Sequence, residues 1–458
     1  MEAKAHDLGT ILESVPDYQV FLTVDELTAS SRQLAGQYPD AVQVLEIGQS
    51  RQGDTIEALK IGDGARTALL FAMPHPNEPI GSMMLEFLAA RLAQDRALRE
   101  RLGYTWYLIK CIDPDGTRLN EGWFKGPFSV TDYARHYYRP PSFQQIEWTF
   151  PVDYETLHFD TPLPETRALM ALIEGTRPDF IFSLHNSGFG GVYFYLSEET
   201  PGLYDRFYRL VEDQGLPLHL GEPEMPYAIP YAKAVYAFPP IASMYDFLKD
   251  QTGKDPAEIL KAGTSSMDYA SRFCNPLGLV CEMPYFHNPA IHNTAPSDMV
   301  RRYAILEGLA THRAELETLQ EQYTGVEGEL TVDSPFRAAI AEMLRTWQDR
   351  LLAYENWART DPKTERQATV AEKLDNLVID RFYRLLSLGM FVRLLETQIT
   401  ATGSSPALDA ALEATTTWFQ ERSSALEADL DYSVIPIQKL VRVQLGTALL
   451  AAEYAAGR

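Results

Sequence analysis

The chain has 458 residues, of which 45% are hydrophobic and 22% charged, so it has the composition of a globular protein and enough length for two domains. Its formal net charge of −23 argues against nucleic acid as a partner, because the phosphates would be repelled. No apolar segment approaches the ~18 residues that a membrane span needs, and residues 1–18 lack the pattern of a secretory signal. We therefore expect a cytoplasmic protein without a membrane partner.

The first part of the chain alternates predicted strands with predicted helices. A helix is expected over residues 18–35, with Thr23 as its N-cap and with Asp25 and Glu26 in its first turn. Residues 41–48 and 54–62 alternate apolar and polar side chains, which predicts a hairpin. This alternation predicts an α/β fold in which helices sandwich a mixed, largely parallel sheet. Further strands are expected at 66–74, 104–112, 179–185, 191–197 and 277–281, and helices at 80–95 and 165–175.

The sequence changes character near residue 310. Strand patterns disappear, and long helical patterns occupy residues 334–358, 365–400, 405–430 and 435–456. Ser334 and Ser405 each precede a proline, as an N-cap precedes a first-turn proline. We therefore predict a catalytic domain over residues 1–310 and an all-α bundle of four or five helices over residues 311–458. The bundle would serve dimerisation or substrate gating, or would be an appended packing domain.

Four residues that suit metal chemistry lie where predicted strands end. His75 and Glu78 follow one apolar run, His185 follows another, and Glu282 follows a third. Because the carboxyl ends of parallel strands meet at one edge of a sheet, we expect these side chains to converge. Two imidazoles and a carboxylate form a zinc tripod that leaves one position open for water. Glu282 would then act as general base on that water; the alternative is a structural ion pair.

Several segments resemble the zinc carboxypeptidase family, in the right order, over residues 18–310. They are the Gly-x-Ser-x-x-Gly corner at 48–53, the Pro-Asp-Gly turn at 114–116, the Pro-Glu-Thr-Arg helix start at 164–167, and the segment 265–284. The resemblance implies one Zn²⁺ per chain, held by His75, Glu78 and His185. It also implies hydrolysis of a peptide or small peptide-like amide by a metal-activated water, in the manner of a carboxypeptidase.

The resemblance further implies an arginine that stabilises the oxyanion. Arg118, which stands in an Arg-x-Asn setting with Asn120, resembles the family's transition-state arginine, and Arg139 is its rival. Asn120 is accordingly a candidate for substrate binding. The family's pocket-floor segment aligns with residues 266–269, where Met267 favours apolar rather than basic substrate side chains.

The chain also departs from the family pattern. Neither residues 121–123 nor 147–149 supply the Asn-Arg pair that grips a terminal carboxylate, and the loop tyrosine has no clean counterpart, so that Tyr245 or Tyr269 would substitute. Three hypotheses follow. The first is a carboxypeptidase-type metallopeptidase, and the second is an N-acyl amino acid deacylase resembling the aspartoacylase and succinylglutamate desuccinylase branch. The third is a metal-binding protein without turnover. The helical domain is also a candidate surface for homo-oligomerisation.

Overall fold

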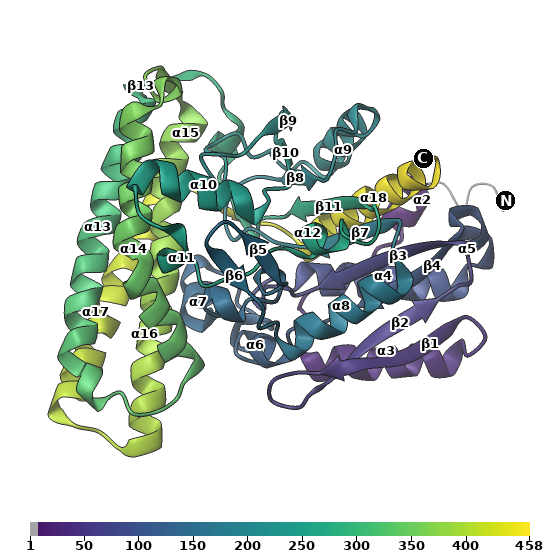
Figure 1. Ribbon diagram of the computed structural model, residues 1–458, viewed down its shortest axis with the longest axis horizontal. Coiled ribbons are helices and arrows are strands. Elements are labelled where there is room, and N and C mark those ends of the chain that lie inside the picture. The colour runs from purple at the N-terminus through teal and green to yellow at the C-terminus, as the bar shows by residue number, and fades with distance from the viewer. Residues whose placement is uncertain (1–7) are drawn as a thin grey trace.

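A nine-stranded sheet forms the centre of the protein (Figure 1). The computed structural model describes residues 8–458; residues 1–7, part of the segment for which we expect no secretory signal, lie outside that range. The strand order is β1-β2-β4-β3-β7-β11-β8-β10-β9, and the central neighbours β4, β3, β7 and β11 run parallel. Antiparallel strands flank this centre on both sides, which confirms the predicted mixed sheet between helices.

The strands coincide with the apolar runs of the sequence, and the predicted hairpin is confirmed as β1 and β2. The large sheet consists of β1 (Val42–Gln49), β2 (Thr55–Ile61), β3 (Arg66–Ala72), β4 (Tyr104–Ile109), β7 (Phe180–Leu184), β8 (Tyr193–Leu196), β9 (Pro230–Ala232), β10 (Val235–Ala237) and β11 (Leu277–Glu282). Three two-stranded ladders accompany it: β5 (Val152–Tyr154) with β6 (Leu157–Phe159), β12 (Phe286–His287) with β15 (Ser433–Val434), and β13 (Pro296–Val300) with β14 (Gln367–Thr369).

Helices cover both faces of the sheet, and alternate strand residues enter two separate cores. In β3, Leu70 points into the larger core, whereas Leu69 and Phe71 point into the smaller one. Helices α3 (Val24–Gln37), α4 (Ile80–Gln94), α9 (Pro201–Asp213) and α18 (Ile437–Ala456) contribute to the larger core, and α8 (Pro164–Thr176) and α12 (Ser266–Ala270) to the smaller. Further helices of this part of the chain are α2 (Leu8–Glu13), α5 (Arg96–Leu102), α6 (Pro114–Arg118), α7 (Val130–His136), α10 (Ile241–Thr252) and α11 (Pro256–Ile259).

Helix α3 begins later than the sequence pattern indicated. The helix expected from residue 18 starts at Val24, because Thr23 and Glu26 form a capping box. The hydroxyl of Thr23 accepts from the N–H of Glu26, and the carboxylate of Glu26 accepts from the N–H of Thr23 at 2.8 Å. The predicted N-cap is thus confirmed, and the cap itself sets the boundary of the helix.

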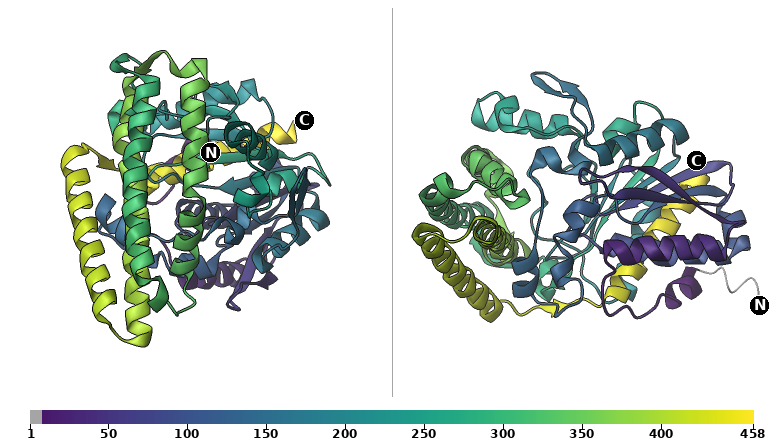
Figure 2. Two further views of the ribbon diagram at one scale, coloured as in Figure 1. Left: turned by 60° about the vertical axis from the view of Figure 1, so that its left-hand side comes forward. Right: turned by 90° about the horizontal axis from the view of Figure 1, so that it is seen from below.

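Four long helices stand together beside the sheet (Figures 1 and 2). They are α13 (Arg301–Val326), α14 (Pro335–Thr360), α16 (Asp380–Thr402) and α17 (Pro406–Asp429). Ser334 and Ser405 cap α14 and α17 as predicted, since their hydroxyls accept from backbone N–H groups of the first turn. Helix α15 (Val370–Leu374) and a π-helical turn (Asp375–Ile379) lead into α16. No helix within residues 8–458 is long and apolar enough to cross a membrane.

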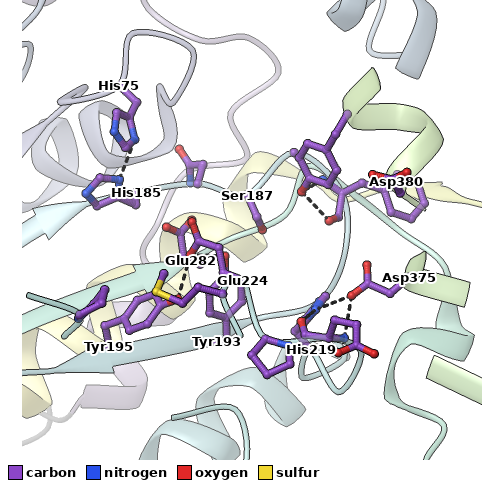
Figure 3. Close-up of a pocket in the computed structure, with 18 of the residues that line it drawn as sticks. His75, His185, Ser187, Tyr193, Tyr195, His219, Glu224, Glu282, Asp375 and Asp380 are labelled. Carbon is purple, nitrogen blue, oxygen red and sulfur yellow. Dashed lines mark hydrogen bonds and ion pairs between the residues drawn. The ribbon is translucent and has the colours of Figure 1, made fainter. Parts of the chain in front are cut away.

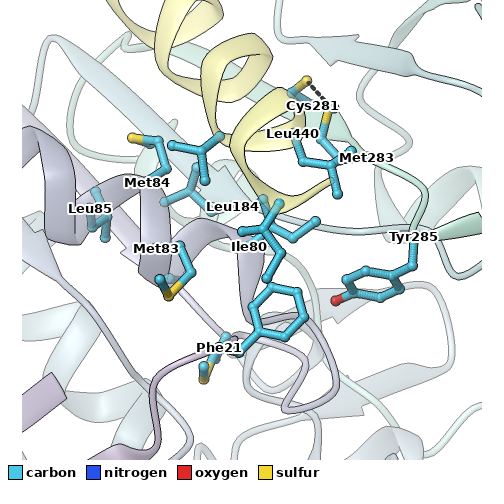
Figure 4. Packing of buried hydrophobic residues seen from close by; sticks show 14 of the residues in the cluster. Phe21, Ile80, Met83, Met84, Leu85, Leu184, Cys281, Met283, Tyr285 and Leu440 are labelled. Atoms are coloured by element: carbon cyan, nitrogen blue, oxygen red, sulfur yellow. Dashed lines mark hydrogen bonds between the residues drawn. The ribbon is translucent and has the colours of Figure 1, made fainter. Parts of the chain in front are cut away.

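The last helix, α18, does not join these four helices. It packs against α4, α9, β7 and β11, where Leu440 lies beside Ile80, Leu184 and Met283 (Figure 4). Its buried residues occur around the whole helix, which is the pattern of a helix enclosed on all sides rather than one at a surface. The segment predicted as one bundle therefore divides between the bundle and the α/β part, and the domain boundary at residue 310 stays a prediction.

Candidate metal centre

The carboxyl ends of three adjacent strands carry the predicted metal and catalytic residues. His185 directly follows β7, Glu282 is the last residue of β11, and His75 comes three residues after β3. Between β3 and His75, the buried Met73 has a φ of 57°, a left-handed conformation that costs about 1 kcal/mol or more and turns the chain out of the sheet. Glu78 lies in the same turn, just before α4, and so faces the same point as His75.

The donor atoms of the three predicted ligands converge. Nδ1 of His185 lies 3.1 Å from Nδ1 of His75 and 3.0 Å from Oε2 of Glu78, and Nδ1 of His75 lies 3.2 Å from Oε1 of Glu78. Ligand atoms about 2.1 Å from a tetrahedral zinc ion lie about 3.4 Å from one another, close to this spacing. All three residues are buried. Two imidazole nitrogens and a carboxylate at this separation fit zinc, and they form a candidate three-ligand site.

Two buried polar side chains support the second ring nitrogen of His185. Nε2 of His185 lies 2.8 Å from the hydroxyl of Ser183, which in turn lies 3.2 Å from Oε2 of Glu147. If the Ser183 hydroxyl donates to Glu147, it accepts from Nε2–H of His185 and leaves Nδ1 free to hold the metal. The amide of Gln444, on α18, donates to the carbonyl oxygens of His185 at 2.9 Å and Cys281 at 3.3 Å. His185 is thus held by both its ring and its backbone.

Replacing Ser183 by Ala is expected to lower zinc affinity by about 10- to 100-fold, because the second ring nitrogen of His185 then has no oriented partner. Competition with a chromogenic chelator measures the effect. Ser271→Ala, at an exposed hydroxyl, is the matched control and should leave the affinity unchanged. An unchanged affinity in Ser183→Ala would refute the support assigned to this chain of groups.

The two histidines differ in their affinity for protons when no metal is bound. Burial, with the charge of Arg139, lowers the pKa of His75 to about 3. Burial also opposes the charged form of His185, but its hydrogen bond to Glu78 and the charges of Glu78, Glu282 and Glu147 outweigh this and raise its pKa to about 9. Near neutral pH, the imidazole of His185 is therefore in its protonated, charged form and that of His75 is neutral.

Zinc binding is therefore expected to release one proton and to strengthen as the pH rises. A zinc ligand must be an unprotonated nitrogen, and His185 is protonated below pH 9, so the affinity should increase about tenfold per pH unit between pH 6.5 and 8.5. Calorimetry in buffers of different ionisation enthalpy counts the proton directly. A pH-independent affinity would show that His185 binds the metal without losing a proton.

Glu282 and Arg139 lie beside these ligands. Burial raises the pKa of Glu282 well above its ordinary value, and the negative charges of Glu78 and Glu224 add to the effect. Arg139 donates to Oε1 of Glu78 at 3.1 Å and lies 2.8 Å from Nδ1 of His75. These are the lone pairs that a metal would use, so the guanidinium and a metal ion cannot share them.

All five residues line a cavity of about 550 Å³. Its floor is the edge of the sheet, and one wall is formed by Tyr193 and Tyr195 of β8 with the following loop at 222–226. The helical segment forms another wall, in which Asp375 and Asp380 face the cavity (Figure 3). The helical wall also includes Ile305, Leu309, Tyr354, Trp357, Asn376, Tyr383 and Leu386.

The sequence model of the zinc carboxypeptidase family matches residues 27–284, which is more than half of the chain and includes all four predicted metal and catalytic residues. The chain belongs to the zinc carboxypeptidase family. Among curated proteins it is similar to zinc carboxypeptidase A 1 of Anopheles gambiae, with 30% identity over 128 residues, 24% of this chain and 29% of that protein. The matched part is thus under a third of that relative's length.

Two solved structures of carboxypeptidases are also similar to the chain. One is carboxypeptidase A from Helicoverpa armigera, with 13% identity, a TM-score of 0.40, and coverage of 79% of this chain and 80% of that chain. The other is a metallo-carboxypeptidase from Burkholderia cenocepacia, with 20% identity, a TM-score of 0.34, and coverage of 57% and 60%.

The structure separates the two arginines that the zinc carboxypeptidase resemblance suggested. Arg139 lines the cavity, whereas Arg118 is held outside it by Asp25 at 2.8 Å and Asp54 at 2.9 Å. Asn120 is likewise outside the cavity lining. Its amide donates to the carbonyl oxygens of Gly116 and Tyr138, and its own carbonyl accepts from the N–H of Tyr138, so it braces two backbone segments.

The other three residues expected to bind substrate also lie outside the cavity lining. The hydroxyl of Tyr245 bonds with that of Thr156 at 2.7 Å, and its ring belongs to a small core beside α14. Met267 and Tyr269 are buried in the core between α8, α12 and the sheet. The aligned segment therefore places these two residues in an apolar core and not in the lining of this cavity.

Sequence reasoning missed several residues that contact the centre. Glu147 and Ser183 support His185, and Glu224, Tyr193 and Tyr195 form the wall next to Glu282. A signal for Glu147 existed, since it stands between Ile146 and Trp148, and a carboxylate between two large apolar residues indicates a buried partner. Alternation along β8 could have placed both tyrosines on one face of the sheet.

Proposed function

We propose that this chain is a zinc-dependent metallopeptidase of carboxypeptidase type, which hydrolyses a peptide or peptide-like amide bond. The observation that carries the proposal is the approach of two imidazole nitrogens and a carboxylate to within 3.2 Å of one another, at the edge of a cavity that Glu282 also lines. Membership of the zinc carboxypeptidase family supports the same chemistry.

Zinc held by His75, Glu78 and His185 would polarise the scissile carbonyl and acidify a water molecule. Glu282 removes a proton from the water as its oxygen bonds to the carbonyl carbon. It then delivers that proton to the nitrogen as the carbon–nitrogen bond breaks, so that an acid and an amine leave.

We assign stabilisation of the oxyanion to Arg139 rather than Arg118. Arg139 is within 3.1 Å of two metal ligands and lines the cavity. Because its guanidinium and a metal ion cannot share the same lone pairs, bound zinc would leave this cation free beside the site, and a cation near developing negative charge lowers the barrier of acyl transfer. The two ion pairs of Arg118 with Asp25 and Asp54 engage its charge elsewhere.

Digestion of a mixed peptide pool tests the proposal. Half of the peptides carry a free C-terminus and half an amidated one, and products are read by mass spectrometry with chelator, without it, and after zinc is restored. Zinc-dependent loss of single C-terminal residues from the free set supports the carboxypeptidase assignment. Release of acyl groups from N-acyl amino acids instead would replace it with the deacylase. A zinc-loaded protein that cleaves neither would overturn the assignment of an enzyme.

The cytoplasmic location and the homo-oligomerisation through the helical bundle stay predictions. Light scattering coupled to size-exclusion chromatography tests the second directly. If the protein is a monomer at high micromolar concentration, the bundle does not serve oligomerisation. Its role is then to form one wall of the cavity, which its residues line.

A further inference from the structure

The wall of the cavity next to Glu282 carries a carboxylate with an unusual set of partners. Glu224 accepts from the hydroxyl of Tyr195 at 2.8 Å and from that of Tyr193 at 3.4 Å. Both donors are neutral, so they orient the carboxylate without cancelling its charge. Within residues 8–458, no cationic side chain forms an ion pair with Glu224, and the residue is exposed to the cavity.

Other acidic groups of the cavity are already engaged. Glu78 belongs to the metal site, Glu147 is buried against Ser183 and Ser266, and Glu222 binds Arg301. Asp375 lies 3.2 Å from Nε2 of His219, and Asp380 pairs with Arg384. Glu282, which also has no ion-pair partner among the described residues, is assigned to the reaction itself. Glu224 thus remains as a carboxylate of the lining that has neither a cationic partner nor another assigned role.

Cations of the cavity are engaged as well. The arginines that line it are Arg139, which is assigned above to the oxyanion, and Arg301, whose guanidinium bonds Glu222 and lies 3.5 Å from Glu372. The part of the cavity between β8 and the helical segment is therefore acidic. A net charge of −23 adds a field of the same sign, which attracts cations from solution.

Glu224 lies close to Glu282, the proposed catalytic base. Tyr193 is the cross-strand neighbour of Glu282 in the β8–β11 ladder, and side chains opposite each other in such a ladder are about 5 Å apart. Glu224 accepts a hydrogen bond from the hydroxyl of Tyr193. Its negative charge also raises the pKa of Glu282, to which burial and the charge of Glu78 contribute more. Figure 3 shows Glu224, Tyr193, Tyr195 and Glu282 together on this wall.

We propose that Glu224, with Tyr193 and Tyr195, is a subsite for an ammonium or guanidinium group of the substrate, so that the enzyme prefers a basic residue next to the scissile bond. A charge-assisted hydrogen bond to the carboxylate and contact with aromatic rings are the interactions that such cations make. The inference rests on the proposed function. It also replaces the expectation, drawn from Met267, that the pocket favours apolar side chains.

The test compares two peptides that differ only in arginine or citrulline next to the cleaved bond, since citrulline has the same shape without the charge. For the full-length, zinc-loaded protein, kcat/KM should favour the arginine peptide by about 10- to 100-fold. Glu224→Gln keeps the shape of the side chain and should bring this ratio close to one. Glu212→Gln, at an exposed position of α9, is the matched control and should keep the ratio of the unmodified protein.

A second measurement is independent of turnover. Calorimetric binding of arginine amide and citrulline amide to the zinc-loaded Glu282→Gln variant should show the same preference, and adding Glu224→Gln should remove it. Preferential binding without hydrolysis would leave the subsite standing and overturn the proposed function. Hydrolysis of both peptides at equal rates, or a preference that survives Glu224→Gln, would overturn the subsite and leave the function intact.

Discussion

Replacing Glu282 by Gln is expected to leave zinc bound and to lower kcat by about 10²–10⁴-fold, the range that general acid–base catalysis contributes. Glutamine has the size of glutamate but cannot take a proton from water or return one to the leaving nitrogen. Glu282 is not among the three converging ligands, so the metal content should stay unchanged. Stopped assays of peptide hydrolysis, with zinc measured by atomic absorption on the same sample, check both halves of the prediction.

Glu413→Gln is a suitable control for this substitution. Glu413 is an exposed residue of α17 and does not line the cavity, so its replacement should change neither turnover nor zinc content. Full activity in Glu282→Gln would refute the assignment of the base. Loss of zinc together with activity would instead assign Glu282 to the coordination of the metal.

Replacing His75 by Ala is expected to reduce zinc from one ion per chain to near zero after dialysis, because two ligands remain of the three that converge. The loss should also appear in stability. At a zinc concentration 100 times its Kd, binding raises the free energy of unfolding by about 2.7 kcal/mol in the unmodified protein. Denaturant titrations with and without zinc should show this increment, and His75→Ala should lack it.

His292→Ala is the matched control for His75→Ala. His292 is exposed at the end of a short helical turn and does not line the cavity, so its loss should affect neither zinc nor the zinc-dependent stability. Retention of one zinc ion by His75→Ala would refute the ligand set.

The strand-end residues could be predicted from the sequence because their positions depend on local patterns. His185 directly follows β7, and Glu282 ends β11. Adjacent parallel strands end at the same edge of a sheet, so these two positions lie close together independently of the rest of the fold. The N-caps Thr23, Ser334 and Ser405 were predictable for the same reason, since a cap acts within one helical turn.

The other residues that line the cavity were harder to predict because they come from distant segments. Arg301 meets Glu222, and Asp375 meets His219, only after the helical segment has packed beside β8. The direction of a side chain is equally a matter of tertiary packing. Tyr245 and Met267 are the residue types expected of a substrate pocket, but both are turned into apolar cores.

The position of α18 has a consequence for the order of events during synthesis. Residues 437–456 fill the larger core beneath β7 and β11, and Gln444 joins the carbonyl oxygens of His185 and Cys281. A nascent chain in which residue 310 has just left the ribosome contains every metal ligand but not this helix. The part of the larger core that α18 fills, between α4, α9 and the strands β7 and β11, therefore stays uncovered until more than a hundred further residues have been translated. Chaperones that bind exposed apolar surface should meet this protein on the ribosome, and truncation before α18 should yield aggregation rather than a smaller enzyme.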